Sequence, residues 1–467
     1  MNSKLLLLIF IAFQFVTAEK IYTQVKVPSI FSNNMVLQQK SETQIWGWDQ
    51  PSKEITIKAS WDTTVVKVKC SNTSLWRATL KTPYAGGPYF ITIAGTDKLI
   101  LSNVMIGEVW ICAGQSNMEM SANWGIKNGE EEVKSACYTN IRLFNENKRF
   151  NESPQVDCSG NWEECSPATM RTFSAVGYFF GRYLQDSLKV PIGLINISWA
   201  GIAGECFVTK DRILNDSLLS ANARKQRKDY SWCPFMPGGL YNSMLYPIIP
   251  FRIAGAIWYQ GEANIITANG YNKLLKTLIE NWRSDFGFNF PFYFVQIAPF
   301  AYSEERNAAF LREAQQQTLE VLNTGMVVTT DLVDNIKNIH PKDKQTVGLR
   351  LANLALSEYY GFKRIVSKSP VYKSMKIEKN KIRIYFDNVP TTLISKNGQP
   401  TCLRIAGKDH KFISAQGKID KTTLIVYAKN LKNPVAVRFS FTSDSMGNLF
   451  NKEGLPVSPF RTDKWNE

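Results

Sequence analysis

The chain has 467 residues and a formal net charge of +15. At about 150 residues per domain it has room for about three domains, and a hydrophobic fraction of 44% is typical of packed globular proteins rather than of disordered ones. No dense basic block with interleaved aromatic residues occurs, which argues against nucleic acid as a partner. The scattered lysines favour solubility as the role of the positive charge, with attraction of anionic sugars as the alternative.

The first residues have the pattern of a signal peptide. A basic start at residues 1–4 is followed by an apolar run over 5–16, then by Thr17 and Ala18 and a charged pair. This run is shorter than the ~20 residues that span a bilayer, so we predict a signal peptide over residues 1–18. Later stretches are too short or too polar to hold the chain in a membrane. We therefore expect a secreted or lysosomal protein with no membrane anchor.

Residues 19–105 predict an N-terminal β domain. The segments 55–60, 65–70 and 89–93 alternate or are rich in β-branched residues, with Pro and Gly turns between them.

Three of the sequons and most of the cysteines lie beyond this region. Four sequons suit a glycoprotein, namely those at Asn72, Asn151, Asn196 and Asn215. Asn196 ends an apolar strand, where burial would compete with glycosylation.

Residues 106–362 predict a parallel α/β domain. Short apolar runs at 109–113, 192–197, 253–259, 292–297 and 326–330 are typical of strands buried on both faces. Helical segments over 176–188, 271–286 and 312–322 alternate with them. After this region the alternating segments 375–378, 381–386 and 423–428 predict a C-terminal β domain over 363–467.

Eight cysteines could form disulfides in an oxidising compartment. Cys158 and Cys165 could close a small loop, and Cys206 and Cys233 a larger one, although the sequence leaves the pairing open. Cys/His clusters with zinc spacing are missing from the sequence, so we expect no metal and no cofactor.

Polar residues follow the predicted parallel strands, and the carboxyl ends of such strands form the active sites of open α/β sheets. Ser116 follows the first run, Gly201 the second, and Gln260 and Glu262 the third. Taken singly, each has a structural explanation: a helix cap for the serine, a turn for the glycine, and a helix start for the glutamate.

Histidine is the commonest general base in enzymes, and the chain contains only His340 and His410. His410 lies between charged residues in the predicted C-terminal β domain, as a surface residue would. His340 follows the last strand of the α/β domain. If the chain has a catalytic histidine, the sequence therefore predicts that it is His340.

Together these strand ends resemble the sialate O-acetylesterase family of the SGNH hydrolase superfamily. The resemblance is carried by Gly-Gln-Ser-Asn-Met-Glu-Met at 114–120, Trp-Tyr-Gln-Gly-Glu at 258–262 and Ile-His-Pro at 339–341, with further matches at 35–38, 240–244 and 311–315. It implies an SGNH-type three-layer parallel-sheet domain flanked by N-terminal and C-terminal β-sandwich domains.

The resemblance implies removal of O-acetyl esters from sialic acids, with the 9-O-acetyl group preferred. Ser116 is then the nucleophile and His340 the base. The oxyanion would be held by the N–H groups of Ser116 and Gly201, with the Gln260 amide as a further donor. An O-acetylated sialic acid or sialoglycan is the expected partner.

The acid of the triad stays open at this point. Related SGNH enzymes place an aspartate two or three residues before the histidine, where this chain has Lys337 and Asn338. Glu262 is the first candidate, because related acetylesterases with Gln-Gly-Glu use that glutamate. Asp334 and Asp331 are the alternatives, and a dyad without an acid is the third.

Sialic acid is a carboxylate, so an arginine in the pocket is expected. Arg312 lies in a family motif, but a structural salt bridge explains it equally well.

Two other functions remain open. An acetylesterase for another acetylated glycan, such as xylan, would use the same residues. A non-catalytic glycan-binding protein would predict a lost serine or histidine, and both are present.

Overall fold

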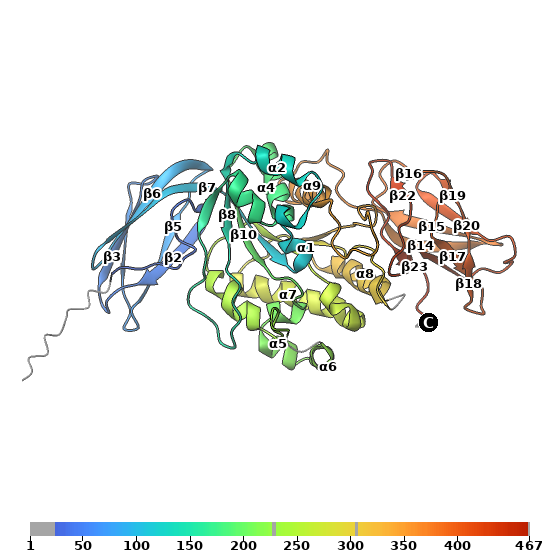
Figure 1. Ribbon diagram of the computed structural model, residues 1–467, viewed down its shortest axis with the longest axis horizontal. Helices are drawn as coiled ribbons and strands as arrows, with labels where there is room; N and C mark the ends of the chain where they lie inside the picture. The colour runs from blue at the N-terminus through green and yellow to red at the C-terminus, as the bar shows by residue number, and fades with distance from the viewer. Residues whose placement is uncertain (1–23, 227–229, 304–306, 466–467) are drawn as a thin grey trace, which may run out of the picture.

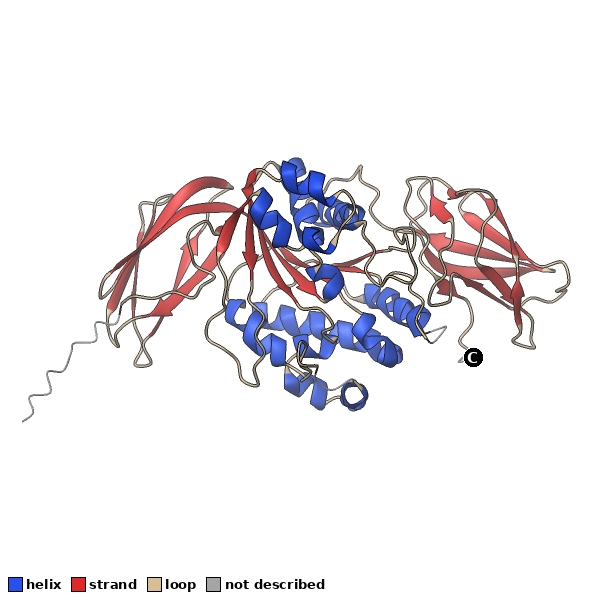
Figure 2. Cartoon of the chain, viewed as in Figure 1, coloured by secondary structure: helices blue, strands red, loops and turns tan. Residues whose placement is uncertain are grey.

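The computed structural model describes residues 24–226, 230–303 and 307–465. A body of mixed strands and helices lies at the centre, with one β-rich region at each end of the molecule (Figures 1 and 2). The predicted signal peptide lies outside the described residues.

The central sheet is mostly parallel, with strand order β13-β12-β11-β7-β10-β8-β9. All neighbours in this order are parallel except β8 and β9, which pair antiparallel. The strands are β7 (Lys98–Gly114), β8 (Tyr138–Asn145), β9 (Trp162–Cys165), β10 (Ile192–Ser198), β11 (Gly255–Tyr259), β12 (Phe292–Val295) and β13 (Thr324–Val327).

Helices cover both faces of this sheet (Figure 1). The helices are α1 (Ser116–Glu119), α2 (Gly129–Ser135), α3 (Pro167–Thr172), α4 (Ala175–Leu188), α5 (Lys210–Leu214), α6 (Ser217–Lys225), α7 (Tyr271–Phe286), α8 (Asn307–Gln317) and α9 (Lys344–Leu354).

The side chains of β7 alternate between the two faces of the sheet: Val109, Ile111 and Ala113 pack with α7, whereas Trp110 and Cys112 pack with α4 and α9. This alternation explains why the strand is apolar on both faces.

The N-terminal β region is joined to the central sheet by β7 itself. The first half of β7 pairs with β1 and β6, and the second half with β10 and β11. The other strands here are β1 (Val36–Gln38), β2 (Glu42–Trp48), β3 (Glu54–Ala59), β4 (Val65–Lys69), β5 (Leu75–Lys81) and β6 (Gly86–Ala94). The predicted domain boundary after residue 105 thus falls inside a continuous strand.

The C-terminal region has its own small core and contains two four-stranded sheets and a two-stranded one. Its strands are β14 (Val371–Glu378), β15 (Lys381–Asp387), β16 (Leu393–Ser395), β17 (Leu403–Ala406), β18 (Phe412–Ser414), β19 (Gln416–Asp420), β20 (Thr423–Tyr427), β21 (Ala436–Phe439), β22 (Leu449–Asn451) and β23 (Phe460–Arg461). The mixed α/β class with β sheets on either side is therefore confirmed.

The structure corrects the sequon at Asn196. This residue lies in β10 and is 6% exposed; its Nδ2 donates to Asn145 Oδ1 at 2.7 Å, and its Oδ1 accepts from Ser198 Oγ. Burial and the two hydrogen bonds of this amide argue against a glycan at Asn196 in the folded protein. The other three sequon asparagines, Asn72, Asn151 and Asn215, are exposed.

The expected disulfides are not formed in this structure. All eight cysteines lie within its described ranges, and each is a free thiol, including both candidate pairs. Cys158, Cys165, Cys206 and Cys233 are buried, and burial raises the pKa of each thiol. Within residues 24–465, apart from the two short gaps, no helix is both long and apolar enough to cross a membrane.

Candidate active site

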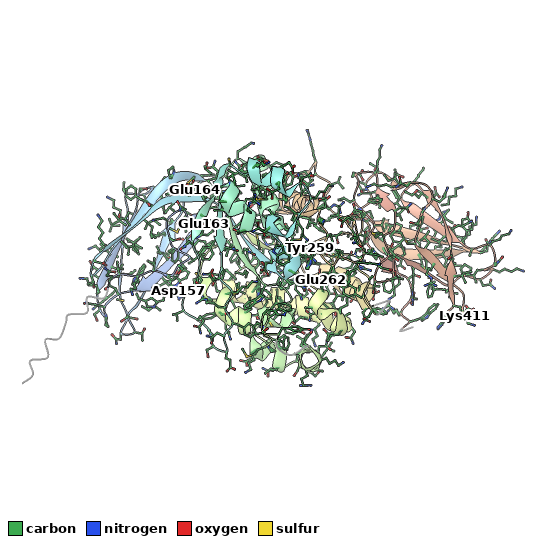
Figure 3. All side chains as sticks on the ribbon, in the orientation of Figure 1. Asp157, Glu163, Glu164, Tyr259, Glu262 and Lys411 are labelled. Carbon is green, nitrogen blue, oxygen red and sulfur yellow. The ribbon has the colours of Figure 1, made fainter. Side chains whose placement is uncertain are left out.

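A cavity of about 560 Å³ opens beside the carboxyl ends of the central strands. Ser116 follows β7, Gly201 follows β10 and Glu262 follows β11, and all three line this cavity together with His340. Figure 3 shows Glu262 and Tyr259 in the central body, between the two β regions. Much of the remaining wall is apolar or aromatic, with Trp124, Trp232, Phe235, Ile266, Phe300 and Tyr302 among its residues.

The backbone at the end of β7 presents Ser116 to the cavity. Gly114 has φ +143°, and a Cβ there would lie 2.2 Å from the backbone oxygen of Tyr259 on β11, so the close approach of the two strands needs glycine. The Gln115 side chain accepts from the N–H groups of Gly261 and Ala263 and ties the two strand ends together. Ser116 is the first residue of α1, where backbone N–H groups have no partner within the helix.

The turn after β10 places Gly201 on the cavity wall with φ +75°. The preceding N–H, that of Ala200, donates to the carboxylate of Glu119, which also pairs with Lys148 at 2.6 Å. A Cβ on Gly201 would lie 2.6 Å from the Trp232 ring. The turn is therefore fixed on one side by the carboxylate and on the other by the ring, which suits a backbone donor of fixed direction.

The expected oxyanion role of Gln260 does not fit its placement. The side chain is 0% exposed and is not part of the cavity wall. Its Nε2 donates to the Ile202 carbonyl and to Asn264 Oδ1, and its Oε1 accepts from Tyr271 O–H. Both amide hydrogens are bonded within the protein, so Gln260 holds neighbouring residues in place and offers no donor to substrate.

Glu262 is a buried carboxyl with one unused oxygen. Its Oε1 accepts from Asn117 Nδ2 at 2.5 Å, whereas no described residue hydrogen-bonds to its Oε2. Burial raises the pKa of Glu262, and the Asn117 hydrogen bond and the Lys344 charge act in the opposite direction. An unpaired buried carboxylate oxygen in the same cavity as a histidine is suited to orient that ring.

The alternative acids lie elsewhere. Asp331 forms a two-point ion pair with Arg350, at 2.7 and 2.8 Å. Asp334 is exposed and is not part of the cavity wall. Asp331 already has a partner and Asp334 is in solvent, so neither placement supports the role of triad acid. Asn338, at a position where an aspartate is usual, accepts from the backbone N–H of His340 and shapes the turn instead.

His340 is half-buried, and its ring packs edge-on against Trp124 with 5.6 Å between centroids. Burial lowers the pKa of His340, and the positive charge of Lys344 lowers it further. Both effects favour the neutral imidazole, which is the form that can take a proton. His410 stacks on Trp465 in the C-terminal region, away from this cavity.

Two residues of the site were not predicted from the sequence. Asn117 joins Glu262, Lys344 and the carbonyl of Ile339 by hydrogen bonds. Lys344, the first residue of α9, is 1% exposed. Asn117 follows the nucleophile directly, and that adjacency was the available signal. A lysine four residues after the histidine carried no comparable signal, because lysines are usually exposed.

Comparisons with known proteins identify the family. A family model described as carbohydrate esterase, sialic acid-specific acetylesterase, matches residues 106–357. Sialate O-acetylesterase of Mus musculus is 27% identical, with 89% of each chain covered, and that of Homo sapiens is 29% identical, with 75% of this chain and 74% of the relative covered. The crystal structure of a carbohydrate acetylesterase from Xanthomonas citri superposes with a TM-score of 0.87 at 34% identity, covering 95% of this chain and 100% of that one.

The family match covers more than half of the chain and includes the segments that supply Ser116, Gly201, Glu262 and His340. The chain therefore belongs to the sialic acid-specific acetylesterase family of carbohydrate esterases.

Proposed function

We propose that this protein removes O-acetyl esters from sialic acids by a serine acyl-enzyme mechanism. The observation that carries the proposal is the convergence of Ser116, Gly201, Glu262 and His340 on one cavity in a member of this esterase family. The family match also favours an ester hydrolase over a non-catalytic glycan-binding protein.

In the proposed first half-reaction, His340 takes the proton of Ser116 Oγ while Oγ bonds to the acetyl carbonyl carbon. The N–H groups of Ser116 and Gly201 stabilise the oxyanion. The carbon–oxygen bond to the sugar then breaks, and His340 delivers its proton to the departing sugar oxygen. Glu262 orients the imidazole and stabilises its protonated form.

In the second half-reaction, His340 takes a proton from water as the water oxygen attacks the acetyl carbon. The bond to Ser116 Oγ breaks, the serine regains its proton, and acetate leaves. The aromatic wall of the cavity supports sugar binding, because ring faces pack against the apolar face of a pyranose. We include a preference for the 9-O-acetyl group in the proposal.

A second candidate substrate is another acetylated glycan, such as xylan. The Xanthomonas citri relative is named a carbohydrate acetylesterase and is more similar to this chain, at 34% identity, than the mammalian relatives are. This observation favours testing a neutral sugar beside the acidic one.

The test is acetate release from 9-O-acetylated sialic acid, 4-O-acetylated sialic acid and acetylated xylose, with wild type and Ser116→Ala. Sialate turnover that the substitution abolishes, with little turnover of acetylated xylose, supports the proposal. Preferential turnover of acetylated xylose assigns the second candidate instead. Lack of turnover on all three substrates by the folded wild type contradicts the esterase proposal.

We further propose an SGNH-type architecture for the central domain, with β-sandwich domains at both ends, and a secreted or lysosomal location. Helices on both faces of a parallel sheet support the first. Exposed sequons at Asn72, Asn151 and Asn215 support the second. A mass shift on treatment of the secreted protein with an N-glycosidase, lost when these asparagines are changed to glutamine, tests the location.

A further inference from the structure

Asn117 is the centre of a hydrogen-bonded chain beneath the catalytic residues. Its Oδ1 accepts from Lys344 Nζ at 2.6 Å, and its Nδ2 donates to Glu262 Oε1 at 2.5 Å and to the Ile339 carbonyl at 3.1 Å. One amide therefore contacts the residue before His340, the candidate acid and a lysine, and it belongs to the residue that follows Ser116.

The direction of this amide depends on Lys344. An amide oxygen only accepts and an amide nitrogen only donates, so the ammonium group at Oδ1 directs Nδ2 toward the carboxylate. In the opposite orientation, Nδ2 would face the ammonium and Oδ1 would face the carboxylate, and both contacts would be repulsive. The lysine, together with the Ile339 carbonyl on the opposite side of the amide, thus fixes which side of Asn117 faces Glu262.

Lys344 occupies a position that disfavours a cation in two ways. It is 1% exposed, although lysine is almost never fully buried unless it is paired. It is also the first residue of α9, and the N-terminal end of a helix carries partial positive charge. Burial lowers the pKa of Lys344 to about 7, against the opposing charges of Glu262 and Asp343.

The groups around Lys344 come from four elements. They are Asn117 of α1, Glu262 at the start of η5 (Glu262–Gly270), the ring of Tyr259 at the end of β11, and His340 and Asp343 from the segment that precedes α9. The ammonium lies 5.2 Å from the centre of the Tyr259 ring. Asp343 is itself paired with Lys127 at 3.3 Å and accepts from the N–H of Thr346.

We propose that Lys344 is a positioning residue of the esterase site: through Asn117 it fixes the Glu262 carboxylate and the backbone next to His340 relative to Ser116. The inference rests on the proposed serine-esterase function. Lys344 does not line the cavity, so its effect should appear in the rate of the chemical steps more than in substrate binding.

The test compares Lys344→Met, which removes the charge and the donor, with Lys344→Arg, which keeps both. Lys342→Met is the matched control, because Lys342 is exposed and only two residues away. Initial rates with 4-nitrophenyl acetate and with 9-O-acetylated sialic acid give kcat and KM, and thermal unfolding shows that each variant is folded.

We expect Lys344→Met to lower kcat on the order of 10²-fold, as expected for misplaced catalytic groups, with KM within about twofold of wild type and the control unchanged. The Lys344 charge lowers the pKa of both His340 and Glu262. Its removal raises both, so the acidic limb of the kcat/KM profile should move to higher pH. Partial recovery of kcat and of this limb in Lys344→Arg would separate the charge from a packing effect.

Coupling to Asn117 provides the second readout. If Lys344 acts through Asn117, the kcat losses of Asn117→Ala and Lys344→Met should not add in the double variant. Wild-type kcat and an unmoved acidic limb in folded Lys344→Met would overturn the inference and leave the proposed function standing. If Lys344→Met does not fold, Lys344→Gln takes its place, and a wild-type rate and profile in that variant overturn the inference equally. A folded wild type that hydrolyses no acetate ester contradicts the proposed function itself.

Discussion

The nucleophile gives the most direct test at the residue scale. Ser116→Ala removes the atom that forms the acyl-enzyme, so we expect kcat to fall on the order of 10⁶-fold, as in other serine hydrolases. The measurement is acetate release, with folding checked by thermal unfolding. Ser121→Ala is the matched control, because Ser121 is also a buried serine near α1 but does not line the cavity. A Ser116→Ala variant with substantial turnover would remove this residue from the mechanism.

The identity of the triad acid is tested by two substitutions, each of which replaces a carboxylate with the amide of the same shape. Glu262→Gln keeps the shape of the side chain but removes the charge that stabilises the imidazolium, so we expect kcat to fall on the order of 10⁴-fold. Asp334→Asn should leave kcat unchanged, since Asp334 is exposed and outside the cavity wall. A large loss in Asp334→Asn with little loss in Glu262→Gln would reverse the assignment.

The base should set the acidic limb of the pH profile. His340 must be neutral to accept the serine proton, and burial together with the Lys344 charge lowers its pKa from the ordinary 6.5. The fraction of active enzyme should therefore stay high as pH falls to 6.5 and decline only below it. The kcat/KM profile of wild type with 9-O-acetylated sialic acid measures this limb. An acidic limb centred above pH 6.5 would contradict a base in this environment.

Residue types and strand ends predicted Ser116, Gly201, Glu262 and His340 as neighbours, and all four line one cavity. Side-chain direction could not be predicted in the same way. Gln260 leaves the end of β11 pointing into the protein, where Tyr271 and Asn264 hold it. Such a direction depends on partners that are distant in sequence, and so does the burial of Lys344.

At the element scale, the turn after β10 is tested by Gly201→Ala. The new Cβ would lie 2.6 Å from Trp232 at φ +75°, so the turn must shift and misdirect its N–H group. We expect kcat to fall about 10²–10³-fold, the usual cost of losing one oxyanion donor. The measurement is kcat with 4-nitrophenyl acetate.

Gly287→Ala is the control for this turn, because Gly287 has nearly the same φ, +78°, with no heavy atom within 4 Å of the added Cβ. It ends α7 and should affect stability alone. Equal kcat losses in both variants would attribute the effect to backbone strain and not to the oxyanion site.

The elements predicted from the sequence agree best with the structure where the hydrophobic pattern alone determines them. The helix predicted over 271–286 matches α7, and each of the five apolar runs of the central region overlaps a strand of the sheet. The helix predicted over 312–322 was displaced, because α8 spans Asn307–Gln317 and a 3₁₀ turn follows at Thr318–Glu320. The continuity of β7 across the predicted boundary was also missed, since pairing with β1 and β6 is a property of the fold and not of the segment.

At the scale of the whole molecule, α8 connects the central body to the C-terminal region. Arg461 forms a two-point ion pair with Glu313, and Ser458 Oγ donates to Gln316. Arg312 is 0% exposed and donates to the carbonyls of Thr442 and Ser443. The arginine considered from sequence as a ligand for the sialate carboxylate thus lies in the contact between the two regions, and it does not line the cavity.

Replacement of this arginine tests the contact. Arg312→Met leaves the buried Ser443 carbonyl and the partly buried Thr442 carbonyl without their donor. Because an unpaired buried group costs about 1–3 kcal/mol, we expect the free energy of unfolding to fall by at least about 1–3 kcal/mol. We also expect earlier proteolysis of the C-terminal region and little change in KM. Arg364→Met replaces an exposed arginine and should leave the free energy of unfolding, the rate of proteolysis and KM unchanged. A raised KM for O-acetylated sialic acid, but not for a neutral acetate ester, with wild-type stability would instead assign Arg312 to recognition of the carboxylate.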